Sequence, residues 1–262
     1  MKKKELEEIY EVRDIRFKEI FTRVNSFFST EKSSLVKLFI PFCILTVLST
    51  YLGQAQGRMA RGMGLILMII SQFVSLFITA FFLLSLDDLQ GPFVSKDKIS
   101  RTFAKIWSQF VTLLAMMVKM FPFILVIVAA AGGISMLTGS LYYNSVTTII
   151  SVIAIIAIFV FVVRYFLSAA ISVLSEHEGF SAVNLSLLIV DKNYGQILFL
   201  LGAFMAVFIG YGLLISLGAF NMVIIYILPI LITPISFYFM MVQYFLVKDS
   251  FAKKAEPIVE EA

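Results

Sequence analysis

Long runs of mostly apolar residues dominate the pattern of this chain. A bilayer hydrocarbon core of about 30 Å requires about 20 residues of α-helix at about 1.5 Å each. Six runs approach or exceed this length, at residues 35–52, 63–86, 110 or 120–137, 146–168, 197–217 and 222–247. Runs such as VIAIIAIFVFVV lack the alternation of a membrane β-strand. The pattern therefore predicts six transmembrane helices.

Shorter segments with one apolar face precede three of the predicted spans. In RFKEIFTRVNSFF the apolar residues share one helical face, and the charged and amide residues share the other. ISRTFAKIWSQF repeats this arrangement, and GFSAVNLSLLIV is a more apolar version of it. We therefore predict three units, each an amphipathic interfacial or re-entrant helix followed by a two-span hairpin. A surface helix would then end near Met117, with Lys119 at the lipid headgroups, where it can snorkel.

These runs divide the chain into one membrane domain with two polar ends. Residues 1–34 form a cytoplasmic N-terminal tail and amphipathic helix. Residues 35–247 form a six-span domain with cytoplasmic amphipathic segments near 95–118 and 176–194, and residues 248–262 form a polar cytoplasmic tail. The predicted fold class is an all-α integral membrane protein with its six transmembrane helices arranged as three hairpins.

Composition and charge agree with a membrane location. Apolar residues make up 60% of the chain and charged residues 15%, which lies far from the composition of a soluble domain. Lysine and arginine gather in the two tails and in the second and fourth loops, whereas the opposite side carries only Arg58 and Arg61. This bias predicts a bacterial inner-membrane protein with both termini cytoplasmic. We assign the basic pI to topology and to attraction for anionic headgroups, and not to nucleic-acid binding.

The segment SEHEG holds the only histidine, His177, between Glu176 and Glu178. Adjacent positions on a helix point about 100° apart, so these side chains do not converge on one metal ion as those of HExxH do. Carboxylates before an apolar run favour a helix N-terminus, and Gly179 permits a turn there. The sequence also contains no P-loop and no GxSxG motif. We favour a polar helix start over a metal or acid–base site and expect no catalytic residue, cofactor or metal.

The order of these segments resembles a known family. RDIRFKEIFTRVNSFF, a hairpin, a second amphipathic helix and VVRYFLSAAISVLSEHEGFSAVNLSLLIVDKNYGQILFLL follow one another as in the membrane domain of glycerophosphoryl diester phosphodiesterases and related stand-alone six-span bacterial proteins. The most specific matches are RY at 164–165 and ExxGxxAxxxS at 176–186. In the fused relatives the phosphodiesterase chemistry belongs to a separate soluble barrel. The resemblance therefore implies a membrane module without its own hydrolase.

Arg164 is a charged residue inside a predicted span, near its cytoplasmic end. Leaving it unpaired in hydrocarbon costs about 2.5 kcal/mol or more, so it should snorkel, bind a lipid phosphate or pair with a carboxylate. The resemblance implies Glu176 as partner, although an unbroken helix would separate the two residues by about 18 Å. The pair therefore predicts a turn between Ser172 and Gly179 that packs the following helix against the fourth span, with Glu178 or a lipid phosphate as substitutes for Glu176.

Small residues recur at four-residue intervals in the fifth predicted span, at Gly202, Ala206 and Gly210. Such a seam lets helices approach closely. We expect it to pack within the monomer in preference to forming a homodimer, and we leave the oligomeric state open.

The sequence favours a non-enzymatic scaffold or partner subunit in envelope or lipid homeostasis. Its expected partners are membrane lipids, with a membrane protein as a further candidate, and no nucleic acid. The alternative is a small transporter or lipid-handling protein with a cavity between the hairpins, which a cavity lined by Gln72, Arg164 or Gln243 would favour. An intramembrane enzyme would need a convergent set of titratable groups, and the sequence does not supply one.

Overall fold

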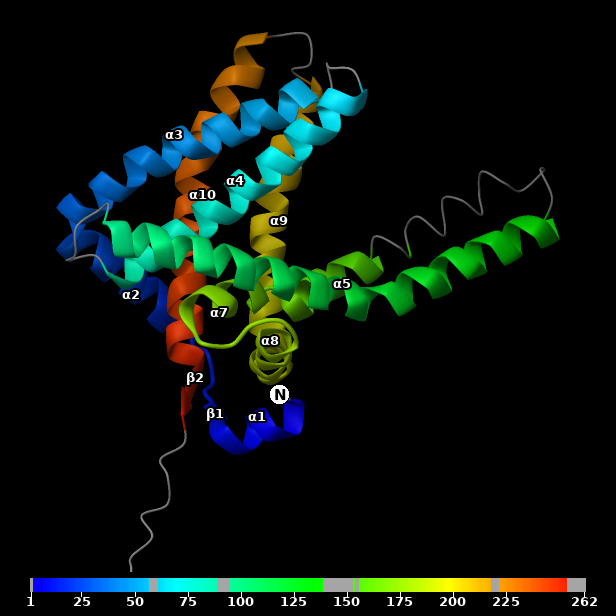
Figure 1. The fold of residues 1–262 in the computed structure, drawn as a ribbon, viewed down its shortest axis with the longest axis horizontal. Helices are drawn as coiled ribbons and strands as arrows, with labels where there is room; N and C mark the ends of the chain where they lie inside the picture. The colour runs from blue at the N-terminus through cyan, green and yellow to red at the C-terminus, as the bar shows by residue number, and fades with distance from the viewer. Residues whose placement is uncertain are drawn as a thin grey trace, which may run out of the picture.

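The computed structural model describes residues 2–56, 61–88, 95–138, 153, 156–217 and 222–253, and these are almost wholly helical (Figure 1). The helices are α1 (Lys3–Ile9), α2 (Phe17–Thr30), α3 (Lys32–Gln56), α4 (Arg61–Asp87), α5 (Lys96–Thr138), α7 (Ser168–Leu174), α8 (Phe180–Lys192), α9 (Tyr194–Leu217) and α10 (Met222–Ser250). Residues 156–165 are also helical and lead into α7. The predicted all-α class is confirmed.

Three helical segments are long and apolar enough to cross a membrane: Ile69–Asp87, Lys96–Val126 and Ile156–Leu174. A fourth crossing arises if Phe180–Lys192 and Tyr194–Val207, which meet at a bend of 100°, form one broken span. The predicted loops around residues 57–60, 139–145 and 218–221 lie outside the described residues. The described part of the chain thus supports three or four spans, and six spans in three hairpins stays a prediction.

The first amphipathic segment forms a helix of its own, α2, which ends at Thr30, and Glu31 separates it from α3. Ile20 and Val24 are buried, while the predicted polar face is exposed. Phe21 and Phe28 stack on the ring of Tyr238 in α10, with centroid distances of 6.2 and 6.0 Å. The apolar face of α2 therefore packs on protein, and a position of this helix at the membrane interface stays a prediction.

The second amphipathic segment is not a separate helix, contrary to the prediction. α5 runs without interruption from Lys96 to Thr138, with Pro122 inside it. Proline removes one backbone donor and kinks a helix, but the loss does not always end it. α5 continues past Lys119, whose Nζ donates to Asn184 Oδ1 at 2.6 Å and so lies against the protein. The predicted break near Met117 is therefore wrong.

The apolar core joins α3, α4, α7, α8 and α10. Phe42 of α3 contacts Phe82 of α4 and Phe237 of α10, with ring centroids 5.0 and 5.2 Å apart. Ile171 of α7 and Ile189 of α8 are fully buried in the same cluster. This packing fixes the turn between α7 and α8 against the body of the protein.

The two ends of the described chain meet in a short ribbon. β1 (Tyr10–Val12) pairs antiparallel with β2 (Phe251–Lys253), with Glu11 opposite Ala252. The backbone N–H of Arg13 donates to Ser250 O at 2.8 Å and extends this pairing. The ribbon lies below α8 in the view of Figure 1.

Candidate functional site

The turn between α7 and α8 lies at the centre of the polar contacts. α7 ends at Leu174 and α8 begins at Phe180, after Gly179 with φ 55° and ψ −131°. The N–H of Gly179 donates to Thr112 Oγ1 at 2.9 Å, and Lys105 Nζ donates to Ser175 O at 2.5 Å. A lysine that binds the carbonyls at a helix C-terminus stabilises that end. The chain thus turns back between Ser172 and Gly179, where the sequence placed the turn.

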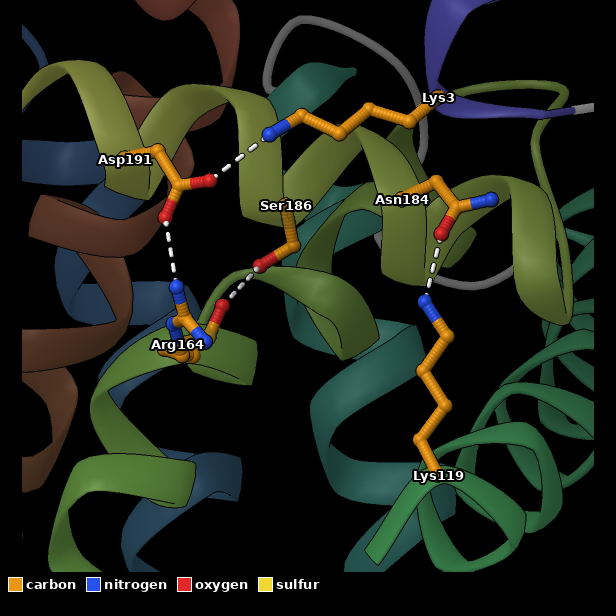
Figure 2. A network of polar contacts seen from close by, with 6 residues as sticks. All are labelled: Lys3, Lys119, Arg164, Asn184, Ser186 and Asp191. Carbon is orange, nitrogen blue, oxygen red and sulfur yellow. Dashed lines mark hydrogen bonds and ion pairs between the residues drawn. The ribbon is translucent and has the colours of Figure 1, made fainter.

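Arg164 pairs with Asp191 and not with the predicted Glu176. The distance from Arg164 Nη2 to Asp191 Oδ1 is 3.4 Å (Figure 2). Ser186 Oγ donates to Arg164 O at 3.2 Å, which shows that α8 returns alongside the helix that carries the arginine. The last turn of α8 therefore brings Asp191 to the guanidinium, while Glu176 is exposed before α8 begins. The turn was predicted correctly and the acidic partner was wrong.

Asp191 also binds Lys3, from helix α1. Lys3 Nζ lies 2.8 Å from Asp191 Oδ2, so one carboxylate holds two cations from distant parts of the chain (Figure 2). All three side chains are partly exposed, at 41% for Lys3, 36% for Asp191 and 49% for Arg164. Exposed ion pairs contribute about 0–1 kcal/mol, so these contacts place charges more than they stabilise the fold.

A third cation approaches α8 two turns away. Lys119 reaches Asn184 from α5, and its Nζ lies 5.8 Å from the ring centroid of Tyr165, within the range of a cation–π contact. Asn184 and Asp191 are seven residues apart, so they share a helix face at an axial separation of about 10 Å. Figure 2 shows Lys119 and Arg164 both extending toward this face of α8 from different helices.

His177 has hydrogen-bond partners at both ring nitrogens. Nδ1 lies 3.0 Å from Ser181 Oγ, and Nε2 lies 2.9 Å from the hydroxyl of Tyr10. The rings of Tyr10 and His177 also meet edge to face at 5.2 Å. Among the residues that the structure describes, no three His, Cys, Asp or Glu side chains form a group that could hold a metal ion. The contacts of His177 favour a structural role, which links β1 to the start of α8.

Acidification should weaken this link. Burial lowers the pKa of His177 below its ordinary value, and the Glu176 carboxylate offsets part of that effect. His177 therefore binds a proton at higher pH in the unfolded chain than in the folded chain. The contribution of neutral His177 to the free energy of unfolding is fully present above about pH 6.5 and is lost as the pH falls below this value. We expect the melting temperature in detergent to fall between about pH 7.5 and 5.5 more steeply than in His177→Gln, whose amide does not titrate. Parallel pH profiles for the two proteins would contradict this role.

Asn193 joins the N-terminal segment to the bend between α8 and α9. Its side chain is buried, and Oδ1 accepts the N–H of Ile15 at 2.7 Å. Nδ2 donates to Arg13 O at 3.2 Å and to Ile189 O at 3.0 Å. Lys192 Nζ also donates to Val12 O and pairs with the Asp14 carboxylate of the same segment. We call these contacts of Asn193 and Lys192 with the N-terminal segment the clasp. The sequence analysis missed the clasp, for which the only signal was an asparagine between two helical patterns.

The small-residue seam of α9 does not pack as predicted. A Cβ placed at Gly202 or Gly210 would meet no atom within 4 Å, and Ala206 is exposed. The seam is therefore open over the described part of α9.

Comparison of the chain with protein families, with curated proteins and with solved structures finds no match.

Proposed function

We propose that this chain is a non-enzymatic protein of the bacterial inner membrane that serves as a scaffold or partner subunit in envelope or lipid homeostasis. Six spans and two cytoplasmic termini are part of this proposal, supported by the apolar runs and the distribution of basic residues. The observation that carries it is an exposed apolar stretch within α5. Residues 121–126 are all exposed, including Phe121 at 61%, Phe123 at 63% and Val126 at 65%.

Six consecutive exposed residues cover every side of a helix, because each position is rotated by about 100° from the last. Burial of one large apolar side chain is worth about 1.5–3 kcal/mol, so a bare helix of this kind requires lipid or another protein around it. Figure 1 shows the C-terminal half of α5 projecting away from the other described helices. A helix with apolar side chains exposed around its whole circumference is suited to bind another subunit in the plane of the membrane.

The polar contacts favour a non-enzymatic role. His177, Lys105 and Asp191 each bind groups of the protein itself, and these contacts connect helices. The resemblance to the membrane domain of glycerophosphoryl diester phosphodiesterases supports the same interpretation, since that domain is separate from the hydrolase.

The alternative function, transport or lipid handling, has one observation in its favour. The side chains of Gln109, Ser85 and Ser168 are buried and contain polar atoms without a hydrogen-bond partner in the part of the chain that the structure describes. Such atoms cost about 1–3 kcal/mol each unless water or a ligand satisfies them, so they favour a polar interior between α4, α5 and α7. Gln72 and Arg164, which the sequence suggested for a cavity, are exposed.

A photoreactive phenylalanine at position 123 should tell these functions apart. We expect benzoylphenylalanine at Phe123 to form a discrete protein adduct when cells are irradiated, because a partner subunit covers α5. The matched control is Phe199 on α9, which is 74% exposed and should give lipid adducts. The measurement is the mass and identity of each adduct after purification in mild detergent.

Lipid adducts alone at Phe123, equal to those at Phe199, would contradict the partner-subunit proposal. In that case the alternative gains support if the purified protein accelerates movement of labelled phospholipid between the leaflets of vesicles.

A further inference from the structure

Cations outnumber carboxylates in the network that Figure 2 draws along α8. The network in Figure 2 contains the three cations Lys3, Lys119 and Arg164 and a single carboxylate, Asp191. Lys119 and Arg164 belong to Lys96–Val126 and Ile156–Leu174, two segments apolar enough to span a membrane. Cations in such segments require an anionic partner or access to the headgroups. An anion from outside the chain would complete the network.

Arg164 has donors to offer such an anion. Its contact with Asp191 joins one guanidinium nitrogen to one oxygen at 3.4 Å, longer than the about 2.7–2.9 Å of a strong charge-assisted hydrogen bond. The guanidinium fork matches phosphate oxygens in a bidentate manner, which this single long contact does not exploit. The side chain is about half exposed, so a ligand can reach it.

The surroundings of the two cations are apolar, as a lipid would require. Met116 lies one turn before Lys119 on α5, on the same face of the helix, and is partly exposed. Val160 lies one turn before Arg164, again on the same face, and is exposed. A free phosphate ion would gain nothing from these side chains, whereas acyl chains would cover them while a phosphate binds each cation. Basic residues between spans bind anionic headgroups in this manner.

We propose that Lys119 and Arg164 bind phosphates of anionic phospholipids on the face of α8 that carries Asn184 and Asp191, one phosphate at each cation because their partners on α8 lie about 10 Å apart. In this arrangement Asp191 holds Arg164 when no lipid is bound and competes with the phosphate for the guanidinium. Lys3 belongs to the same network and adds positive charge from the N-terminal helix.

The test is native mass spectrometry of the full chain, released from detergent that contains phosphatidylglycerol or phosphatidylcholine. We expect the wild type to retain phosphatidylglycerol in preference to phosphatidylcholine. Arg164→Gln and Lys119→Gln should each weaken this retention about tenfold, the effect of losing one charge-assisted hydrogen bond. Arg16→Gln is the matched control, because Arg16 also makes a single 3.4 Å contact, with Glu19, but lies outside the spans.

Asp191→Asn separates binding from misfolding, because it removes the competing carboxylate and keeps Lys119 and Arg164. It should increase retention of phosphatidylglycerol, an effect that a damaged fold would not produce. Added inorganic phosphate should not displace the lipid beyond the effect of chloride at equal ionic strength.

Three results would overturn the proposal. One is equal retention of both lipids by the wild type, and another is loss of phosphatidylglycerol from Arg16→Gln to the same degree as from Arg164→Gln. The third is displacement by inorganic phosphate at matched ionic strength, which would assign the site to a soluble anion.

Discussion

Gly179→Ala should lower the free energy of unfolding by about 2–3 kcal/mol, the cost of a strained backbone conformation together with a close contact. Gly179 has φ 55°, and a Cβ there would lie 3.2 Å from Val111 Cγ1. The N–H of the same residue binds Thr112, so the turn has little freedom to relax. The measurement is the melting temperature in detergent, which should fall by about 5 °C or more.

Gly195→Ala is the matched control for this substitution. Gly195 lies in the helix α9, and a Cβ there would meet no atom within 4 Å. Alanine is favoured over glycine in a helix by about 0.5–1 kcal/mol, so the control should raise the melting temperature. If both variants melted at the wild-type temperature, the turn at Gly179 would not hold α8 in place.

Asn193→Ala should release the N-terminal segment from the bend between α8 and α9, at a cost of about 2 kcal/mol or more. The substitution removes the acceptor of the buried Ile15 N–H and the donor to Arg13 O. Alanine also favours helix at this position, which weakens the 100° bend. Loss of the clasp should separate β1 from β2.

Disulfide formation between Glu11→Cys and Ala252→Cys measures this separation, in a chain whose single native cysteine, Cys43, is replaced by alanine. The two residues are paired across the ribbon, so their cysteines should cross-link efficiently with Asn193 present and poorly with Asn193→Ala. Asn25→Ala in α2 is the control, because Asn25 is exposed. Efficient cross-linking in both variants would show that β1 and β2 stay together without Asn193.

Local patterns predicted the elements whose faces are set by their own sequence. In α2 the apolar positions Ile20 and Val24 are buried as the helical period required. The turn at Gly179 could also be inferred, because a glycine between two apolar runs permits a backbone conformation that other residues resist. These features depend on residues close together in the chain.

The wrong or missed predictions concern contacts between residues that lie far apart in the sequence. Lys119 was placed after the end of a surface helix, but Asn184, 65 positions later, binds the amine, and α5 continues. Arg164 had several carboxylates within reach in the sequence, and only the path of α8 selects Asp191. The contact of the N-terminal segment with Asn193 spans 178 positions, and no local pattern predicts such a contact.

The pairing of β1 with β2 constrains the path of the chain through a bilayer. Two hydrogen-bonded strands lie on one side of a membrane, so residues 12 and 251 share a side and the chain between them crosses the bilayer an even number of times. If the three uninterrupted spans all cross, a further crossing must return the chain, and the bent pair α8 and α9 offers one. Reporters fused to the N- and C-terminal ends must therefore give the same signal. Adding or deleting a single span would place β1 and β2 on opposite sides of the membrane and abolish their pairing.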